Sequence, residues 1–377
     1  MSGIRLAVLL CVLAAVCVLP LPARAAGAAP AVRASAYLVV DARTGDVLAS
    51  SHAHDRVPIA SITKLMTVLL TLEHHKLTDV VTVDPRAAAV GESSIDLNPG
   101  ERLTVSDLLK GALIQSVNDA ADALALSIAP SYPAFAALMN AKATQLGLRD
   151  SHFVRPDGLD AAGEFSSAAD VTKLARLVMR TRFVRETVDE ETTTIAGGRT
   201  LHTWDDLLAL FPKTIGVKTG HTDEAGWCQV AAARGRGVTV YATLLGSPTR
   251  AERNDDLESL LQWGLAQFRV VPVVQDARVY ATAEVGYGRA PLALVAAKPL
   301  LAVARLGKPL TQRVVAARSA SLPVRRGARL GTVEVWAGSR LVGTRDLVAS
   351  RTINKPGVAG RLRWYAGRTF HHLVHLL

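Results

Sequence analysis

Cysteine is scarce in this sequence. Only Cys11, Cys17 and Cys228 occur among its 377 residues, and the first two fall in an N-terminal segment that we expect to be removed. The cysteine that is left cannot form an intramolecular disulfide, so the fold must rely on its hydrophobic core, which a chain of this size is long enough to build. Cys228 lies in the alternating pattern of 227–233, and we interpret it as a small buried hydrophobe rather than a nucleophile.

Familiar motifs of several enzyme classes are also missing. The sequence has no G-x-x-x-x-G-K-[ST], G-x-G-x-x-G, H-E-x-x-H, C-x-x-C or G-x-S-x-G, which removes the usual support for a nucleotide, zinc or α/β-hydrolase site. Aromatic residues make up only 5% of the chain and are not interleaved with its arginines, so the net charge of +10 does not indicate nucleic-acid binding.

The first 25 residues have the pattern of a secretory signal peptide. Arg5 precedes the apolar run Leu6–Leu19, and Ala23-Arg24-Ala25 supplies a cleavage site with small residues on both sides. The alternative is an uncleaved membrane anchor, but a spanning helix needs about 20 apolar residues, and this run is shorter. We therefore expect residues 1–25 to be removed during export.

Composition divides the rest of the chain into two modules. Apolar residues make up 49% and charged residues 20%, which is typical of a globular protein. Residues 266–377 hold 18 of the 43 Lys and Arg but only 4 of the 33 Asp and Glu, so a basic back half follows a mildly acidic front half. We expect the first module to span 30–270.

The first module alternates hairpin and helix patterns. Two apolar β-prone runs in 37–51 surround a turn at Asp41–Gly45, and the runs 227–233 and 238–246 surround Arg234–Gly237. Helices are indicated in 59–72, after Thr104, in 135–147 and in 252–268. This order favours an α+β fold with an antiparallel sheet.

The second module, 272–349, consists of short Val, Leu and Ala runs separated by Gly and Pro, which predicts a small all-β domain whose last hairpin pairs Leu330–Val335 with Leu341–Val348. The basic tail, 350–377, ends in a helical pattern. Its apolar stripe comprises Leu362, Ala366, Thr369, Phe370, Leu373 and Leu377. We expect an amphipathic anchor on a membrane surface, with a helix docked on its own protein as the alternative.

Three short motifs remain as candidates for chemistry: Ser61-x-x-Lys64, Ser116-x-Asn118 and Lys218-Thr-Gly220, each occurring once. Residues three apart on a helix share a face, so Lys64 is placed to take a proton from Ser61. Lysine is a poor base at neutral pH unless burial, a second cation or a helix N-terminus lowers its pKa. Lys64 lies at the start of an apolar helix, and Lys218 would supply the second cation if the fold brings it near. Alone, Lys64 could equally extend to water.

Together with their surroundings, the motifs resemble a known family. The segments ASITKLMTVLLTLE, LLKGALIQSVNDAADALA and GVKTGHTDEAGWCQVAAA are similar to those of D-alanyl-D-alanine carboxypeptidases, the low-molecular-mass penicillin-binding proteins of the bacterial envelope. The resemblance is strong over 35–265 and only general in the β-rich module and tail. It implies a β-lactamase/transpeptidase-like catalytic domain, no metal and no organic cofactor, and a location on the periplasmic or cell-surface face of the cytoplasmic membrane.

The same resemblance implies roles for individual residues. Ser61 would be acylated by the penultimate D-alanine of a peptidoglycan stem peptide, with Lys64 as general base and Ser116 as the proton relay to the leaving amine. Asn118 would bind the substrate amide. Lys218 and Thr219 would meet the terminal carboxylate of the substrate, and Gly220 would let the substrate approach the backbone. The backbone N–H groups of Ser61 and His221 would form the oxyanion hole.

Some positions depart from the family pattern. Val117 stands where Gly is frequent, Arg155 where Asn is more usual, and 201–206 replaces an Asn-rich stretch. Glu164, Glu190 and Glu191 lack the sequence context of a deacylating glutamate, so efficient penicillin hydrolysis is not expected. We expect a carboxypeptidase inhibited by β-lactams. The alternatives are a D,D-endopeptidase or β-lactamase on the same scaffold, or a non-catalytic envelope protein that binds peptidoglycan.

Overall fold

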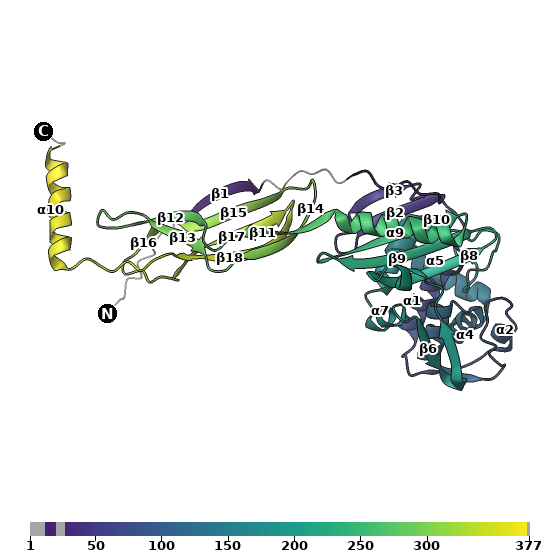
Figure 1. Ribbon diagram of the computed structural model, residues 1–377. Coiled ribbons are helices and arrows are strands. Elements are labelled where there is room, and N and C mark those ends of the chain that lie inside the picture. The colour runs from purple at the N-terminus through teal and green to yellow at the C-terminus, as the bar shows by residue number, and fades with distance from the viewer. Residues whose placement is uncertain (1–11, 20–26, 375–377) are drawn as a thin grey trace. The chain divides into compact units, whose positions relative to one another are not determined.

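The computed structural model describes residues 12–19 and 27–374, which divide into two units (Figure 1). The first unit, Gly27–Gln267, combines helices with an antiparallel sheet. The second unit contains Phe268 onwards together with an N-terminal strand, and it is built mainly from strands. The predicted α+β class with an added β domain is confirmed.

The central sheet of the first unit is antiparallel, with strand order β3-β2-β10-β9-β8. Both predicted hairpins are present, as β2–β3 and β9–β10. The strand that carries the Lys218 motif, β8, lies at one edge of this sheet, so one side of its backbone is not paired with another strand of it. The strands are β2 (Ala36–Asp41), β3 (Val47–Ser51), β8 (Thr214–Thr222), β9 (Gly226–Gly235) and β10 (Val238–Ser247).

Helices cover both faces of this sheet (Figure 1). On one face lies α9 (Arg250–Ala266), where Gly264 packs against Val39 and Val240. On the other lies α6 (Ala168–Val178), whose Thr172 hydroxyl is 2.6 Å from that of Thr243. Val240 and Thr243 are an odd number of residues apart on β10, so their side chains point to opposite faces.

Two helix ends in the first unit lie where capping signals in the sequence predict them. The Thr104 hydroxyl accepts a hydrogen bond from the Asp107 N–H at 3.1 Å, and Gly147 ends a helix in the left-handed conformation with φ 64°. The remaining helices are η1 (Ala60–Thr63), α1 (Lys64–His74), α2 (Pro85–Ala88), α3 (Val105–Lys110), the π-helix η2 (Gly111–Gln115), α4 (Asn118–Ile128), α5 (Tyr132–Leu146), α7 (Arg182–Thr187), η3 (Ala196–Gly198) and α8 (Leu207–Leu210).

Two short hairpins complete the first unit. β4 (Val80–Thr82) pairs with β5 (Arg102–Thr104), and β6 (Thr192–Ile195) pairs with β7 (Arg199–His202). The main hydrophobic core of the first unit includes the apolar run that follows Lys64 and buried residues of α4, α5, α6 and the sheet.

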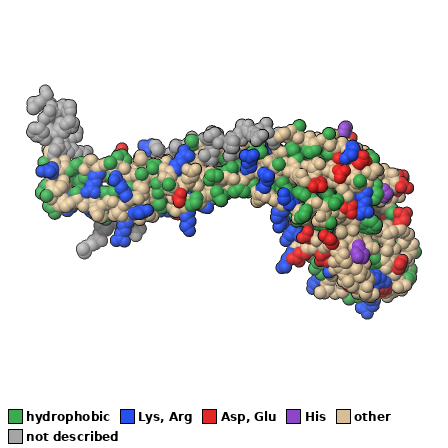
Figure 2. Space-filling model, in the orientation of Figure 1, with side chains coloured by type: hydrophobic (Ala, Val, Ile, Leu, Met, Phe, Trp, Pro, Cys, Tyr) green, Lys and Arg blue, Asp and Glu red, His purple; other side chains and the backbone are tan. Residues whose placement is uncertain are grey.

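The second unit has its own core inside a largely antiparallel sheet of order β1-β15-β17-β18-β13-β12-β16, with β11 and β14 paired beside it. The predicted last hairpin is present as β17 and β18. Lys and Arg dominate the charged surface of this unit, whereas acidic side chains gather over the first unit (Figure 2). The strands are β11 (Phe268–Val274), β12 (Val279–Val285), β13 (Leu292–Ala296), β14 (Leu300–Arg305), β15 (Leu310–Ala317), β16 (Ser319–Ala320), β17 (Arg329–Ala337) and β18 (Arg340–Ala349).

Most of the expected signal peptide lies outside the described residues. Within it, Val12–Leu19 forms β1, which pairs antiparallel with β15. Strand formation and removal during export are alternatives for the same residues, and in an exported chain that lacks 1–25 the sheet would end at β15. Cleavage therefore stays a prediction.

The tail forms helix α10 (Val358–Val374), as predicted. Val358 and Leu362 are about two-thirds exposed, and the Trp364 ring packs edge-on against Tyr287 with centroids 5.3 Å apart. The apolar stripe beyond Ala366 lies outside the described side chains. Residues just before the helix belong to the β unit, because Ile353 is buried and bridges to Val324.

Among the described residues, no single helix is both long and apolar enough to cross a membrane. The pair α4 and α5 meets that criterion jointly, but the two helices are bent by 85° relative to each other, and both contribute to the core of the first unit.

Candidate active site

Ser61 and Lys64 meet at the junction of two helical segments. Ser61 lies in the 3-10 turn η1, and Lys64 is the first residue of α1. The Lys64 Nζ to Ser61 Oγ distance is 2.8 Å. Ser61 is half-buried and faces a pocket, whereas the Lys64 side chain is completely buried.

The other partners of Lys64 define what its amine does. Nζ donates to Asn118 Oδ1 and to the backbone oxygen of Asp157, each at 2.6 Å. Both are carbonyl oxygens, which only accept hydrogen bonds. A neutral amine has two N–H groups and one lone pair, so these two contacts use both N–H groups and leave the lone pair for the Ser61 O–H. The geometry therefore suits a lysine that acts as a base.

Burial lowers the pKa of Lys64 from 10.5 to about 8, because the charged form loses hydration. The carboxylates of Asp157, Asp122 and Glu164 oppose this shift, and the Arg155 guanidinium supports it. At pH 7 roughly one molecule in ten then has the neutral amine, against fewer than one in a thousand at the ordinary lysine pKa.

Ser116 and Asn118 lie where the π-helix η2 gives way to α4. Ser116 adopts the left-handed conformation with φ 62° and lines the pocket. Asn118 begins α4, and its Nδ2 donates to the Glu92 backbone oxygen at 3.1 Å while Oδ1 holds Lys64. Its neighbour Asp119 accepts bonds from Ser94 and from two backbone N–H groups of the same loop. These contacts fix the loop that forms one wall of the pocket.

The Lys218-Thr-Gly220 motif lies on edge strand β8, directly against η1. A Cβ on Gly220 would be 2.8 Å from the Ile59 oxygen and 3.1 Å from the Ser61 nitrogen, so only glycine permits this approach. Residues alternate along a strand, so Lys218 points toward the same face as Gly220, and Thr219 toward the other. Thr219, Gly220 and His221 line the pocket.

Lys218 itself is almost fully buried, and Nζ donates to the Thr219 backbone oxygen at 2.9 Å. Burial, followed by the charge of Lys64, lowers the pKa of Lys218 well below its ordinary value. The two lysines are therefore close enough to influence each other, which is the condition that the sequence left open. Lys218 is not part of the pocket wall, which differs from the expectation that its ammonium meets the substrate carboxylate.

The pocket has a volume of about 220 Å³. The His221 ring lies against Trp227 with centroids 4.0 Å apart, so its side chain is engaged there while its backbone remains at the strand edge. The pocket is lined by Ser61, Glu92, Ser93, Ser116, Asn118, Leu159, Trp204, Thr219, Gly220, His221, Trp227 and Arg253.

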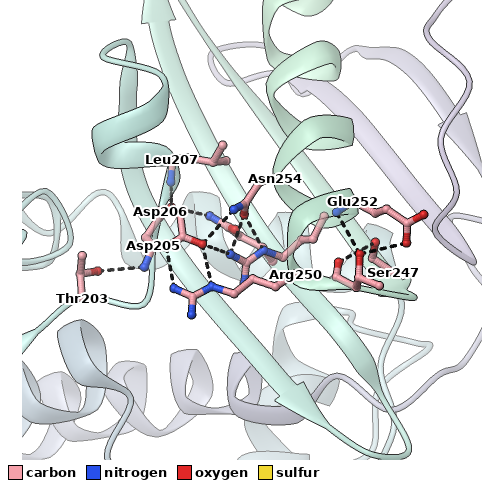
Figure 3. A network of polar contacts seen from close by, with 11 residues as sticks. Thr203, Asp205, Asp206, Leu207, Ser247, Arg250, Glu252 and Asn254 are labelled. Atoms are coloured by element: carbon pink, nitrogen blue, oxygen red, sulfur yellow. Dashed lines mark hydrogen bonds and ion pairs between the residues drawn. The ribbon is translucent and has the colours of Figure 1, made fainter.

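Sequence reasoning missed Arg253, which reaches this pocket from α9. Its side chain is 1% exposed, lies 5.6 Å from the centre of the Trp227 ring, and donates to Asn254 and to Asp206. Asp206 also binds Arg250 through both carboxylate oxygens (Figure 3). The sequence offered one signal for this role: Arg250 and Arg253 are three residues apart and therefore share a face of the last helix of this unit. The acid that binds them, Asp206, belongs to the atypical stretch 201–206.

That atypical stretch also supplies a buried acid. Asp205 accepts a hydrogen bond from Gln229 at 2.7 Å, and its second carboxylate oxygen has no hydrogen-bond partner in the described part of the chain. Burial raises the pKa of Asp205, although hydrogen bonding and the charge of Arg253 oppose the shift. Of the two acids, Asp206 binds Arg253 directly and so helps to hold it at the pocket wall.

The glutamates considered from sequence lie apart from this pocket. Glu164 is held by the Thr63 hydroxyl at 2.8 Å and by the backbone N–H of Arg155 at 2.9 Å, and burial raises its pKa to about 7. Glu164, Glu190 and Glu191 are all outside the pocket lining. Among the described residues, no group of three or more His, Cys, Asp or Glu is arranged to hold a metal ion.

Comparisons with known proteins agree with this geometry. The sequence model of the D-alanyl-D-alanine carboxypeptidase family matches residues 23–249. The D-alanyl-D-alanine carboxypeptidase DacF of Bacillus subtilis is 30% identical over 344 residues, which cover 86% of this chain and 87% of that protein.

Solved structures extend the similarity to the fold. A peptidoglycan synthesis regulatory factor (PBP3) of Streptococcus pneumoniae superposes with a TM-score of 0.65 at 26% identity, covering 86% of this chain and all of that one. The ampicillin-bound penicillin-binding protein D2 of Listeria monocytogenes gives 0.57 at 30% identity, over 62% of this chain and 98% of that one. The motifs, the pocket and these matches agree: the chain belongs to the D-alanyl-D-alanine carboxypeptidase family of serine peptidases.

Proposed function

We propose that this protein removes the terminal D-alanine from peptidoglycan stem pentapeptides through an acyl-enzyme on Ser61. The observation that carries the proposal is the set of contacts around Lys64, whose two N–H groups are held by carbonyl oxygens while Ser61 Oγ lies 2.8 Å from the same nitrogen. Such a lysine activates serine without histidine or metal.

The reaction follows from this arrangement. Lys64 takes the Ser61 proton as Oγ attacks the penultimate D-alanine carbonyl, and the N–H groups of Ser61 and His221 bind the oxyanion. When the tetrahedral intermediate collapses, the C–N bond breaks, and the departing amine of D-alanine receives a proton through Ser116. That proton comes from Lys64, which is then neutral again. Asn118 binds the substrate amide. In the second half of the reaction Lys64 takes a proton from water as the water attacks the ester carbonyl, and it passes this proton to Ser61 Oγ when the ester C–O bond breaks and the shortened peptide leaves as its carboxylic acid.

We assign the substrate carboxylate to Thr219 and Arg253, because both line the pocket beside the edge of β8. A buried guanidinium and a hydroxyl suit a carboxylate. Lys218 acts through charge from behind the strand. Its Nζ donates to the Thr219 backbone oxygen, and it lies near enough to Lys64 for the charge of each to affect the other.

We also propose that penicillins acylate Ser61, as the ampicillin complex of the Listeria relative suggests by analogy. A D,D-endopeptidase or a β-lactamase would use the same nucleophile. A non-catalytic peptidoglycan-binding protein would have no use for a buried lysine held against a serine.

The decisive experiment measures D-alanine release from a stem pentapeptide by the wild type and by Ser61→Ala. We expect release by the wild type and none above background by the variant. Mass spectrometry after treatment with penicillin should find the adduct on Ser61. A folded wild type with neither product nor adduct would refute the proposal, and faster cleavage of a cross-linked dimer than of the pentapeptide would favour an endopeptidase.

We place the enzyme outside the cytoplasm, held at the membrane surface by α10. The support is the basic, partly aromatic composition of the tail and the exposure of Val358 and Leu362. The peptidoglycan substrate and the export signal point to the same compartment.

A further inference from the structure

A group of charged side chains, mostly buried but with Arg155 half-buried, lies behind Lys64 and is not part of the pocket lining. Arg155 binds the carboxylate of Asp157 through two hydrogen bonds, Nε to Oδ1 at 2.9 Å and Nη2 to Oδ2 at 2.6 Å. Asp157 is fully buried, and its own backbone oxygen accepts the bond from Lys64 Nζ. Asp157 therefore connects Arg155 to Lys64, so a substitution of Arg155 would alter the surroundings of the Lys64 amine through this single residue.

A second acid approaches from α4. Asp122 is one turn beyond Asn118, so it shares the helix face that contacts Lys64. It is completely buried, and neither carboxylate oxygen has a hydrogen-bond partner of ordinary geometry among the described residues, although Tyr132 lies near enough to influence it. Burial, followed by the charge of Asp157, raises the pKa of Asp122 to about 7.

These charges act on Lys64 in opposite directions. The anions at Asp122, Asp157 and Glu164 favour its protonated form, and the Arg155 cation favours the neutral form. For Asp157, burial would raise the pKa, yet the bonds from Arg155 and the charge of Lys64 hold it below the ordinary value. The charged groups that face Lys64 are Asp122 from α4, Arg155, Asp157 and Glu164 from the loop 147–167, and Lys218 from β8.

We propose that Arg155 is a positioning residue for catalysis, which holds and neutralises the Asp157 carboxylate so that Lys64 gives up its proton, and that Asp122 acts in the opposite sense. Neither side chain lines the pocket, so neither touches substrate. The inference rests on the proposed function of Lys64. Arg155 and Asp122 shift the protonation of Lys64 in opposite directions, whereas residues with a purely structural role would not.

The test is the pH dependence of acylation by a fluorescent penicillin, measured between about pH 5 and 10 on the full chain. The wild-type rate should rise with pH as Lys64 becomes neutral and level off above its pKa of about 8. Arg155→Met should move the midpoint upward by about one pH unit, and Asp122→Asn should move it downward by at least about half a unit. Arg155→Lys keeps the charge and should restore the wild-type midpoint.

Lys142→Met is the matched control. It removes the cation of another partly buried ion pair, 2.7 Å from Glu73 near the far end of α1, and should leave the midpoint unchanged. Midpoints that do not move, or that move in the same direction for Arg155→Met and Asp122→Asn, would overturn the inference even if the rates fall. If Arg155→Met does not fold, an unmoved midpoint in Asp122→Asn is sufficient to reject it. A wild type that is not acylated at all would instead refute the role of Ser61, and this inference with it.

Discussion

At the scale of single residues, the site depends on an environment that lowers the pKa of Lys64, so that its amine can be neutral. Complete burial lowers the pKa of Lys64 more than any neighbouring charge does. Burial alone would leave the amine without partners, which is costly. Asn118 and the Asp157 carbonyl satisfy its N–H groups, and this choice of carbonyl acceptors leaves the lone pair for Ser61.

Arg253 is the residue whose role we would test first. We expect Arg253→Gln to reduce kcat/KM for a peptide with a free C-terminal carboxylate by about 10- to 100-fold, because a charge-assisted hydrogen bond is lost. The same peptide with a C-terminal amide should be affected much less. Steady-state kinetics on the two peptides make the comparison.

Arg250→Gln serves as the control, because Arg250 binds the same Asp206 but is not part of the pocket lining. It should leave the preference for the carboxylate nearly intact. Equal losses on both peptides in Arg253→Gln would show that the arginine only supports the fold.

At the scale of elements, the site forms where the edge strand β8 meets η1. Gly220 permits that contact, since any side chain there would collide with the Ile59 carbonyl. Near Ser116, the atypical Val117 is accommodated because its neighbour Gly111 has no side chain. Val117 is fully buried, and a Cβ on Gly111 would be only 2.9 Å from its Cγ2, so the atypical valine packs into the space that Gly111 leaves.

Gly220→Ala tests the strand contact. The added methyl group must push β8 away from η1, which displaces the His221 N–H from the Ser61 N–H. We expect penicillin acylation to fall by about 100-fold or more, because misplacement by about 1 Å has effects of this size. Time courses of labelling would measure the loss.

Gly91→Ala is the comparison variant, because nothing lies within 4 Å of a Cβ built there, although the next residue lines the pocket. It should label at the wild-type rate. Equal midpoints of thermal unfolding for the two variants would show that the position of the strand, rather than overall stability, has changed. Labelling of Gly220→Ala at the wild-type rate would contradict the assigned geometry.

At the scale of the whole molecule, two units differ in charge and in core. The acidic first unit holds the complete pocket, and the basic β unit has a separate hydrophobic core that extends to Ile353. Catalysis and attachment to the membrane surface should therefore be separable at the start of α10.

A chain that ends after Pro356 should release D-alanine at the wild-type rate but no longer bind vesicles of anionic phospholipid. This end point retains Ile353, which an earlier truncation would remove from the β core. Flotation with vesicles measures the binding of both forms. Equal flotation of the truncated and full chains would argue against α10 as the anchor.

The sequence by itself determined the hairpins β2–β3, β9–β10 and β17–β18, the main helices α1, α3, α5 and α9, and the order of the three motifs. Turn residues, the cap at Thr104 and the stop at Gly147 place the ends of elements, and strand and helix periods identify their buried faces. The family resemblance rests on the same short sequence segments, and the matches to the family model and to the Bacillus subtilis relative confirm it. Such signals are local, since each depends on residues within a few positions of one another.

Only the tertiary structure decided which distant groups surround the lysine. Asp157 lies behind Lys64 on a loop 93 residues away along the chain, and Arg253 reaches the pocket from α9. The spacing of residues along the sequence does not give either contact. The burial that lowers the pKa of Lys64 is likewise a property of the packed molecule. Electrostatic effects depend on distance in space and on excluded water, and both are defined only once the chain has folded.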